Sequence, residues 1–376
     1  MGDNIDAWLT LLRTPGFGQA AVREWLTAAG GDIQAALAQA KQQASGRGAA
    51  RARAWLRQPD TSLLASDRAW LAEPGHRLLC CDDADFPPQL ETIDKPPAAL
   101  FVAGRVELLL HPQVAIVGSR NATSAGLATA RRFAQTLGSA GFVITSGMAD
   151  GVDGAAHAAA LAADLPTVAV VGTGLDVVYP RKHRELACQI AAQGAVVSEF
   201  PLGTSARAEH FPQRNRIISG LSLGTLVIEA DLCSGSLITA RLAAEQAREV
   251  FAVPGSIHNP LARGCHKLIR DGARLVETPT EVTQILTPAA RALGLELNER
   301  LERAGSSPVV VSGWRGDPAY GALLQALGYD PTDMDDLVGR TGQSASALSS
   351  MLLMLELEGL VESLAGNRFQ RLPEAG

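Results

Sequence analysis

The sequence predicts an α/β protein whose central domain is built on a largely parallel, doubly wound sheet, with a smaller helical unit on either side. Between about residues 76 and 288, short apolar runs alternate with Ala-rich stretches of helical length. The runs are continuously apolar instead of alternating with polar residues. Strands of a parallel sheet are buried on both faces and carry such runs, so the fold class follows.

The length and composition of the chain agree with a folded protein of several domains. A chain of 376 residues exceeds one typical domain, so two or three domains are expected. An apolar content of 47% with 19% charged residues is typical of packed cores. The chain has no run of about 18 apolar residues and its first residues are acidic, so we expect neither secretion nor membrane insertion.

The cysteines and the net charge indicate which kinds of binding site the chain can carry. The five cysteines are scattered and form no C-x-x-C pair, which predicts reduced thiols in a cytoplasm and no metal site. No cofactor is expected either. The formal net charge of −6 argues against a protein coated in basic charge for duplex DNA. Any anion site must therefore be local, and arginine must supply most of its charge, because the chain has only four lysines.

Residues 1–75 are expected to be helical. Apolar residues at helical spacing lead into a Gly-rich turn, Pro15 to Gly18, and a second helix follows. Two short helices joined in this way resemble a helix-hairpin-helix or SAM-like unit, in which backbone N–H groups of the turn can hold a phosphate. A plain helical hairpin without ligand remains the favoured alternative, because matches this short are common by chance.

The central domain is assigned to residues 76–288. Predicted strands are separated by predicted helices such as 126–140 and 236–247. The strands are expected at 114–118, 141–147, 167–172, 195–200, 224–230 and 249–253.

A linker is predicted for residues 289–315, which are rich in Ala, Glu, Arg and Gly. Residues 316–376 then show three helix signals and a short hairpin, the pattern of a winged-helix domain. Its third helix carries Glu356 and Glu358 and no basic residue. Carboxylates facing phosphates are unfavourable, so a protein contact is at least as well supported as duplex reading.

Several matches to catalytic motifs are rejected, because the surrounding predicted elements or the residues themselves do not suit the motif. The G-x-S-x-G match at 220–224 is preceded by a predicted helix and followed by a strand, the reverse of a nucleophile elbow. The Gly172-Thr173-Gly174 loop lacks the third glycine of a dinucleotide fingerprint, and no Gly-Lys dipeptide exists for a Walker A loop. The histidines are dispersed without an evident catalytic partner.

Five polar loops follow predicted strands and should meet at one edge of the sheet, where ligands bind in α/β proteins. Glycines allow close backbone approach, helix N-termini offer unpaired N–H groups, and Arg120, Arg214 and Arg216 can grip phosphate oxygens. Tyr179 and Phe211 either stack on unpaired bases or belong to the core. The loops are 118–121, 146–151, 172–184, 211–216 and 234–236.

The motifs of residues 113–277 closely resemble those of the DprA/Smf family (DNA-processing protein A). They include VAIVGSR (114–120), ITSGMADGVDGAAHAAAL (144–161), VVGTGLDVVYP (170–180), SEFPLG (198–203), FPQRNRIISGLS (211–222), EADLCSGSLITA (229–240), REVFAVPG (248–255) and GCHKLIRDGA (264–273). The resemblance implies an extended Rossmann-like domain that binds single-stranded DNA without catalysis, commonly as a homodimer. It also implies protection of incoming strands during natural transformation and loading of the RecA recombinase.

The resemblance also implies a set of phosphate-binding residues. Lys267 matches a basic or polar position of the family and Lys182 lies in the third loop, whereas Asp150 stands where the family often has arginine and is left out. The expected site comprises Gly118, Ser119, Arg120, Ser146, Gly147, Lys182, Arg214, Asn215, Arg216, Gly235, Ser236 and Lys267.

Two other functions stay open. Phosphoribohydrolase-like nucleotide-processing enzymes share this Rossmann variant, but their G-G-x-G-T-x-x-E loop is matched imperfectly. Here three residues separate Thr225 from Glu229, which moves the carboxylate to the opposite face of a strand. A sequence-specific regulator acting through the winged helix is the third possibility.

Overall fold

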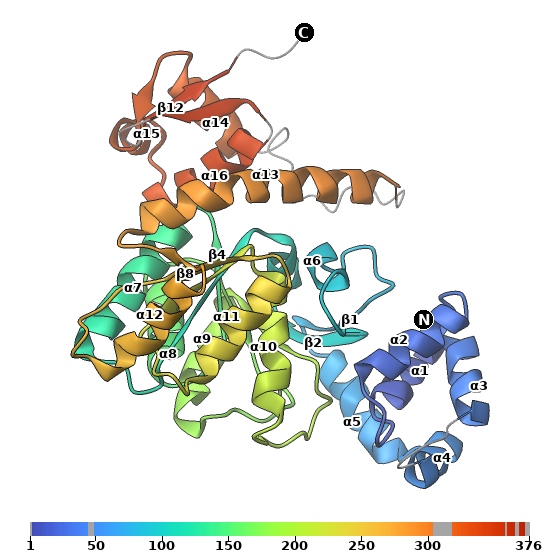
Figure 1. Cartoon of the computed structure of the whole chain (residues 1–376). Helices are drawn as coiled ribbons and strands as arrows, with labels where there is room; N and C mark the ends of the chain where they lie inside the picture. Colours follow the sequence, from blue (N-terminus) through green and yellow to red (C-terminus); the bar gives the residue numbers. More distant parts are fainter. Residues whose placement is uncertain (1, 44–48, 304–317, 358, 365–367, 373–376) are drawn as a thin grey trace.

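The structure, a computed structural model, describes residues 2–43, 49–303, 318–357, 359–364 and 368–372. Three units follow one another along this part of the chain: a group of helices, a central α/β unit, and a C-terminal unit of helices and a small sheet (Figure 1). The predicted fold class is therefore confirmed. No helix of the described ranges combines the length and apolar character needed to cross a bilayer.

The central unit is organised around a nine-stranded sheet, counted over the described residues, in the order β1-β2-β6-β5-β4-β3-β7-β8-β9. Every neighbouring pair from β6 to β9 is parallel, whereas β2 pairs antiparallel with both β1 and β6. The strands are β1 (His76–Cys80), β2 (Ala99–Gly104), β3 (Gln113–Gly118), β4 (Val143–Ser146), β5 (Thr167–Val170), β6 (Ala195–Ser198), β7 (Gly224–Ile228), β8 (Glu249–Ala252) and β9 (Arg274–Leu275).

The strand order creates a switch point between β3 and β7. From β3 the chain adds β4, β5 and β6 on one side, then returns to add β7, β8 and β9 on the other. The connections after β3 and β7 pass to opposite faces of the sheet, because α7 (Ser124–Ser139) and α11 (Gly235–Glu245) belong to different core clusters. A crevice at the C-terminal ends of the strands follows from this topology.

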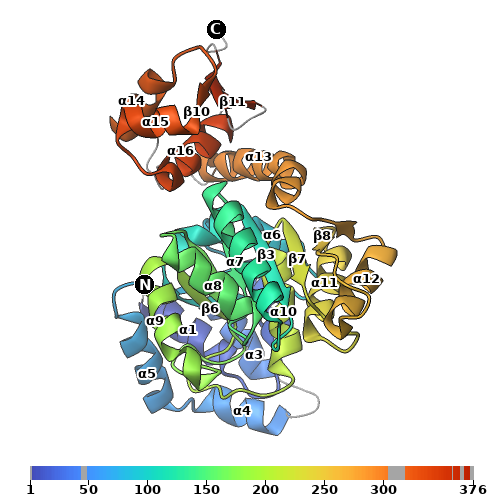
Figure 2. The ribbon, with the colours of Figure 1, turned by 90° about the vertical axis from the view of Figure 1, so that its left-hand side faces the viewer.

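Both faces of the sheet are buried, as the continuous apolar runs require. Val114 and Ile116 pack toward α7 and α8 (Val152–Ala162), the helices that Figure 2 shows in front of the sheet. Ala115 and Val117 pack toward the other face, with α11 and α10 (His210–Leu221). The remaining helical segments of this unit are α6 (Pro88–Glu91), α9 (Arg184–Gln193), α12 (Arg263–Arg270), η1 (Val106–Leu110), η2 (Arg181–His183) and η3 (Pro260–Ala262).

One buried histidine has a defined tautomer. The Thr167 hydroxyl donates to the carbonyl of Ile144 (2.6 Å), so Nδ1 of His157 must donate to Oγ1 of Thr167 (2.7 Å). Nε2 of His157 has no hydrogen-bond partner among the described residues, and the side chain is fully buried. Burial lowers the pKa of His157 to about 3, so the ring is neutral at physiological pH.

The N-terminal helices pack against the antiparallel end of the sheet. Leu78, Cys80, Ala99 and Phe101 of β1 and β2 share one core cluster with these helices, which lie at the right of Figure 1. The helices are α1 (Gly2–Leu12), α2 (Gln19–Ala28), α3 (Ile33–Gln43), α4 (Ala49–Arg57) and α5 (Thr61–Leu71).

The region expected to be a linker is helical for at least half its length. α13 (Pro279–Arg303) continues past residue 289, and Ala290 and Leu293 are buried against the central unit. Ala, Glu, Leu and Arg are strong helix formers, which explains why a segment rich in them is ordered. The rest of that expected linker, residues 304–315, lies outside the described residues.

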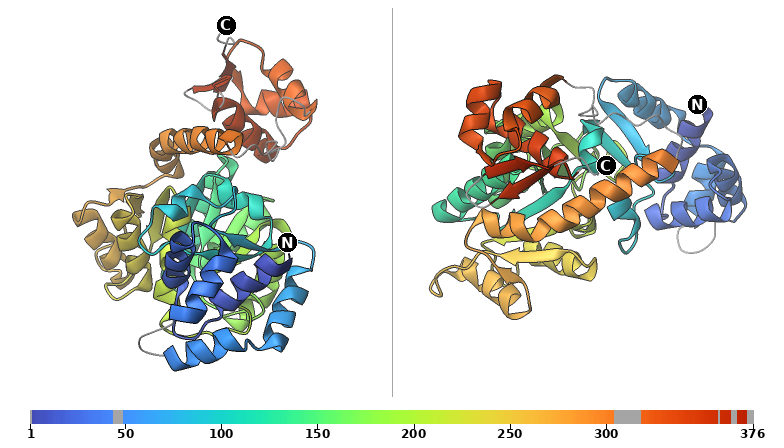
Figure 3. Two further views of the ribbon diagram at one scale, coloured as in Figure 1. Left: turned by 90° about the vertical axis from the view of Figure 1, so that its right-hand side faces the viewer. Right: turned by 90° about the horizontal axis from the view of Figure 1, so that it is seen from above.

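The C-terminal unit stands on α13 and packs against α7 through α16 (Figure 3). Leu353 lies against Gly141, which precedes β4, and Glu356 forms an ion pair with Arg291 of α13. This unit therefore lies at the N-terminal ends of the strands, away from the switch-point crevice. Its elements are α14 (Pro318–Leu327), β10 (Thr332–Asp333), α15 (Met334–Thr341), α16 (Ala345–Leu357), β11 (Val361–Leu364) and β12 (Arg368–Arg371). Glu358 lies outside the described residues.

Candidate anion-binding site

A cavity of about 640 Å³ opens at the switch point, between the ends of β3 and β7 and the start of α10. We call it the anion cavity. It brings together residues from all five loops that the sequence predicted to converge, and a neighbouring hollow of about 60 Å³ adds Gly147. The expected site residues that line the anion cavity are Gly118, Ser119, Arg120, Arg214, Asn215, Gly235 and Ser236.

The loop after β3 is held by close backbone approaches. A Cβ on Gly118 would lie 1.9 Å from the carbonyl oxygen of Ile228, so only glycine fits where β3 and β7 meet. The N–H of Ser119 donates to the carbonyl of Glu229 (2.6 Å), and the N–H of Asn121 donates to the Ser119 hydroxyl (3.1 Å). These bonds fix the position from which Arg120 reaches the cavity.

The N-terminus of α11 forms the second wall. Ser234 caps this helix, and its hydroxyl accepts from the N–H of Ser236. Gly235, the first helical residue, has open space where a Cβ would be. Its N–H has no acceptor within the helix, and the helix dipole adds positive potential, so an anion is favoured here.

Arg214 forms the floor and is almost completely buried (6% exposed). Its guanidinium donates to the carbonyls of Gly147 (2.7 Å) and Val170. A Cβ on Gly147 would lie 2.6–2.8 Å from the guanidinium atoms, so this glycine makes room for the arginine. Burial lowers the pKa of Arg214 to about 10, which leaves it a cation at neutral pH.

Two aromatic rings lie beside the arginines. The Arg120 guanidinium is 5.8 Å from the centre of the Phe211 ring, and the rings of Phe211 and Tyr179 are 5.4 Å apart. Tyr179 is 47% exposed and Phe211 is half-buried, and both line the cavity. Neither ring belongs to the core, so both remain able to stack on a flat ligand.

The formal charge of the lining is close to neutral. Three arginines, at 120, 207 and 214, face two aspartates, at 153 and 231, which leaves one net positive charge. Burial raises the pKa of Asp153, although the charge of Arg214 opposes this. The attraction for an anion therefore depends strongly on oriented N–H groups and on Arg120, which is exposed.

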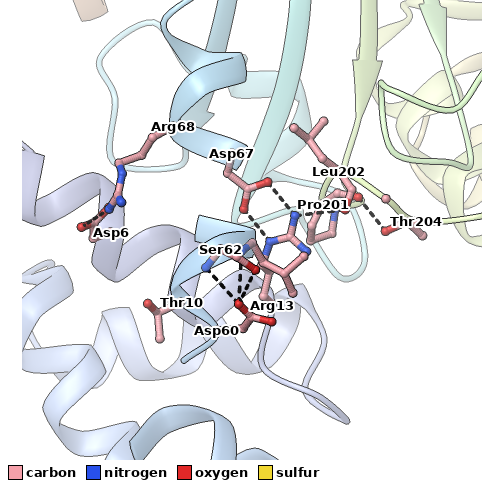
Figure 4. Close-up of polar contacts among 12 residues, drawn as sticks. Asp6, Thr10, Arg13, Asp60, Ser62, Asp67, Arg68, Pro201, Leu202 and Thr204 are labelled. Atoms are coloured by element: carbon pink, nitrogen blue, oxygen red, sulfur yellow. Dashed lines mark hydrogen bonds and ion pairs between the residues drawn. The ribbon is translucent and has the colours of Figure 1, made fainter. Parts of the chain in front are cut away.

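The third wall is a loop that the N-terminal helices hold in place. Arg13 forms a two-bond ion pair with buried Asp67 (2.5 and 2.6 Å) and also donates to the carbonyl of Leu202 (3.0 Å), as Figure 4 shows. Gln19 donates to the carbonyl of Glu199 (2.7 Å). The same loop continues into residues 206–208, which line the cavity.

Four expected site residues lie elsewhere. Ser146 is fully buried and donates its hydroxyl to the carbonyl of Ile116 (2.6 Å), so it supports the loop from below. Arg216 forms a buried ion pair with Glu199 and lines a different cavity.

The two lysines of the expected site also lie outside the anion cavity. Lys182 pairs with Asp150 (2.9 Å), and Lys267 is exposed on α12. Neither lines the cavity, so the structure gathers seven of the expected residues there and Gly147 beside them.

Sequence reasoning did not identify Arg207, Asp153 or Asp231 as lining residues. Asp231 follows β7 and Asp153 begins α8, so the rule that ligands bind at strand ends could have found both. Arg207 carries no such signal, because its position depends on bonds between the 199–209 loop and the N-terminal helices.

Glu229, the carboxylate of the enzyme alternative, is engaged elsewhere. It accepts from the N–H and hydroxyl of Thr123 (2.7 Å each) and from the amide of Asn259 (3.1 Å). It does not line the anion cavity. The carboxylate therefore fixes the start of α7, and the structure offers it no path to a ligand in that cavity.

Two protein families match this chain. The family described as DNA recombination-mediator protein A matches residues 77–287, and the DprA winged helix domain matches residues 315–367. Protein Smf of Escherichia coli is 42% identical over 316 residues, which cover 83% of this chain and 78% of that protein. DNA processing protein DprA of Streptococcus pneumoniae is 46% identical over 197 residues, which cover 52% of this chain and 70% of that protein.

Two solved structures are similar in fold. DNA processing protein A of Streptococcus pneumoniae has a TM-score of 0.66 and 36% identity, covering 74% of this chain and 97% of that one. DNA processing protein A of Helicobacter pylori, whose structure concerns its single-stranded DNA binding mode, has a TM-score of 0.52 and 28% identity, covering 57% of this chain and 97% of that one.

Proposed function

The chain belongs to the DNA recombination-mediator protein A family, also called DprA/Smf, and from this premise we propose that it binds single-stranded DNA through the anion cavity. The observation that supports this most directly is the combination of Arg120, the N-terminus of α11 and two accessible rings in one open cavity. Arginine and N–H groups suit phosphates, and exposed rings suit unpaired bases. Neither feature reads base sequence, so binding should be sequence-independent.

The proposed phosphate contacts come from residues that the cavity gathers. We assign them to Arg120, to the backbone of Gly118 and Ser119, and to the N–H groups that open α11. Arg214 contributes its charge from the floor, since its Nη1 is already bound to two carbonyls. Ser146 and Gly147 shape the adjoining loop.

Reversing the charge of Arg120 tests the assignment. Arg120→Glu should reduce affinity for a labelled oligothymidylate at least a hundredfold, since one phosphate contact is lost and a repulsive charge replaces it. Arg132→Glu, an exposed residue of α7 outside the cavity, changes the net charge equally and should bind almost normally. Equal losses for both variants would show that only overall charge matters, and the site assignment would fail.

A nucleotide-processing role is less well supported. The carboxylate at position 229 is held by three hydrogen bonds outside the anion cavity. We therefore propose binding and not catalysis. Release of free base from a nucleoside monophosphate by the purified protein, lost in Glu229→Gln, would reverse this choice.

The remaining proposals follow from family membership. We propose a homodimer that protects incoming strands during natural transformation and loads RecA onto them. A cytoplasmic site of action agrees with five unpaired thiols, including the neighbours Cys80 and Cys81. Sedimentation analysis would test the dimer, and the rate of RecA filament formation on strands coated with single-strand-binding protein would test loading.

The winged-helix unit stands apart from the proposed DNA site. Glu356, on the helix that would normally read the groove, is bound to Arg291 of α13. We propose that this helix attaches the unit to the central domain. Binding of single-stranded DNA that survives deletion of residues 304–376 would agree with this assignment, and sequence-selective duplex binding by the full chain would contradict it.

A further inference from the structure

A second cavity, of about 450 Å³, lies between the N-terminal helices and the central domain. We call it the hairpin cavity, because Gly18 and Ala20 at the start of α2 form one wall. Arg216 of α10 and Gln246, which follows α11, line the opposite wall. Pro212 lines both this cavity and the anion cavity, so the two adjoin at the first turn of α10.

Two buried polar atoms belong to side chains that line this cavity. Nη1 of Arg216 and Oε1 of Gln246 have no hydrogen-bond partner among the described residues. The rest of each side chain is fixed: Arg216 is ion-paired with Glu199, and the Gln246 amide donates to the carbonyl of Arg216 (3.1 Å). Both atoms have almost no accessible surface, and a buried polar atom without a partner costs about 1–3 kcal/mol, so a group that reaches them through the cavity wall would gain a donor and an acceptor.

The surroundings disfavour a phosphate. A phosphate offers acceptors only and would leave Gln246 Oε1 unsatisfied. The charge of Arg216 is already balanced by Glu199, and the exposed carboxylates of Asp94 and Glu245 line the same cavity. Lys95, the remaining cation of the lining, lies 3.8 Å from Asp94. The cavity is therefore suited to an uncharged group that carries a donor beside an acceptor.

We propose that the hairpin cavity accepts an unpaired nucleobase of the strand whose phosphates occupy the anion cavity. This inference rests on the proposed binding of single-stranded DNA. Every DNA base carries a donor beside an acceptor on its pairing edge, so Arg216 and Gln246 can satisfy any of them. Leu242 and the small residues at 18 and 20 supply walls for the ring faces.

The two cavities are within reach of one strand. Residues 212 and 216 are one helical turn apart, a rise of about 6 Å along α10. A strand that passes over Pro212 can place phosphates on one side of this turn and a base on the other. The N-terminal helical unit thereby becomes part of the DNA-binding surface, through the hairpin cavity and not through a phosphate on the Gly-rich turn.

Filling the cavity provides the test. Ala20→Trp places a large ring at an exposed position that lines the cavity, and Ala28→Trp makes the same change at an exposed position of α2 outside it. Affinities of the full chain are measured for an oligothymidylate and for an oligomer of abasic spacers of equal length. Ala20→Trp should weaken oligothymidylate binding about tenfold, the contribution of one well-held base, and abasic binding less than twofold. Ala28→Trp should leave both affinities unchanged.

A second variant tests the same inference if Ala20→Trp does not fold. Gln246→Met keeps the length of the side chain but removes the acceptor, and it should lower oligothymidylate affinity three- to tenfold with abasic binding unchanged. Equal losses of both oligomers would indicate a blocked phosphate path and overturn the inference, as would unchanged binding of both. If neither oligomer binds the wild-type chain, the proposed function fails and takes this inference with it.

Discussion

Substituting Gly235 by alanine tests the anion cavity while sparing the fold. Gly235 is the first residue of α11, its backbone lies outside the left-handed region, and an added Cβ would meet no atom within 4 Å. Alanine also reduces the freedom of the unfolded chain. The free energy of unfolding should therefore stay the same or rise by up to about 1 kcal/mol.

The same methyl group should weaken DNA binding. It stands beside an N–H that has no acceptor in the helix, where we place a phosphate oxygen. A hydrogen bond to a charged group contributes about 1.5–3 kcal/mol, and each 1.4 kcal/mol is a tenfold change in affinity. Loss of this bond predicts a decrease of roughly ten- to a hundredfold.

The assay combines fluorescence anisotropy of a labelled single strand with urea denaturation. Gly321→Ala is the matched control, because Gly321 lies in α14 of the C-terminal unit with equally open space around it. It should gain similar stability and bind DNA normally. Unchanged affinity of a stable Gly235→Ala protein would refute the backbone contact with phosphate, and a large loss of stability would refute the open-space argument itself.

Three further predictions concern charge. Log affinity should fall linearly with log salt, by about 0.7 per phosphate neutralised, and Arg120→Gln should reduce this slope by about that amount; an unchanged slope would place Arg120 outside the phosphate path. Asp67→Asn should lower the free energy of unfolding, measured in urea, by about 3–5 kcal/mol and also weaken DNA binding, because Arg13 loses its buried partner (Figure 4). Arg68→Gln breaks an exposed ion pair and should lower the free energy of unfolding by under about 1 kcal/mol. The pKa of His157 falls from 6.5 in the unfolded chain to about 3 in the folded chain, so between pH 7 and pH 5 only the unfolded chain binds a proton at this ring. The free energy of unfolding should therefore fall by about 2 kcal/mol over this range. His157→Gln should remove this part of the pH dependence.

The sequence predicted the edge of the sheet at which these loops meet, because strand ends can be read from apolar runs. It could not give the strand order, and the order decides which loops meet. β3 lies next to β7, so the loops at Gly118 and Gly235 share one cavity. β5 lies two strands from β3, and Lys182, which follows it, reaches Asp150 instead.

The placement of Arg216 was within reach of the sequence. Residues 211–216 were expected to form a loop that leads into a helix before residue 220, whereas the structure places all of them within α10. Side chains two residues apart on a helix point about 200° apart, so Arg214 and Arg216 cannot both face one cavity. Applying helical geometry to this pair would have separated them in advance.

The wall formed by residues 206–208 lay beyond sequence reasoning for a different reason. The 199–209 loop contains no helix or strand, and Arg13 and Gln19 hold its first half from almost two hundred positions away in the chain. Contacts of this separation leave no periodic signal. The N-terminal helices therefore shape the proposed DNA site in two ways, by supporting one wall of the anion cavity and by forming one wall of the hairpin cavity.

A chain with a net charge of −6 can still hold a polyanion if the attraction is short-ranged and oriented. The anion cavity has only one net positive charge in its lining, yet Arg120 and the start of α11 direct donors at the same space. Oriented N–H groups act over a few ångströms and need no basic surface around them. Steering from a distance is consequently weak, and the acidic surface should disfavour rigid duplex, which presents more charge to it. A flexible single strand can bring individual phosphates into the cavity and turn its bases toward the rings, which is why local geometry, and not overall charge, should decide what this protein binds.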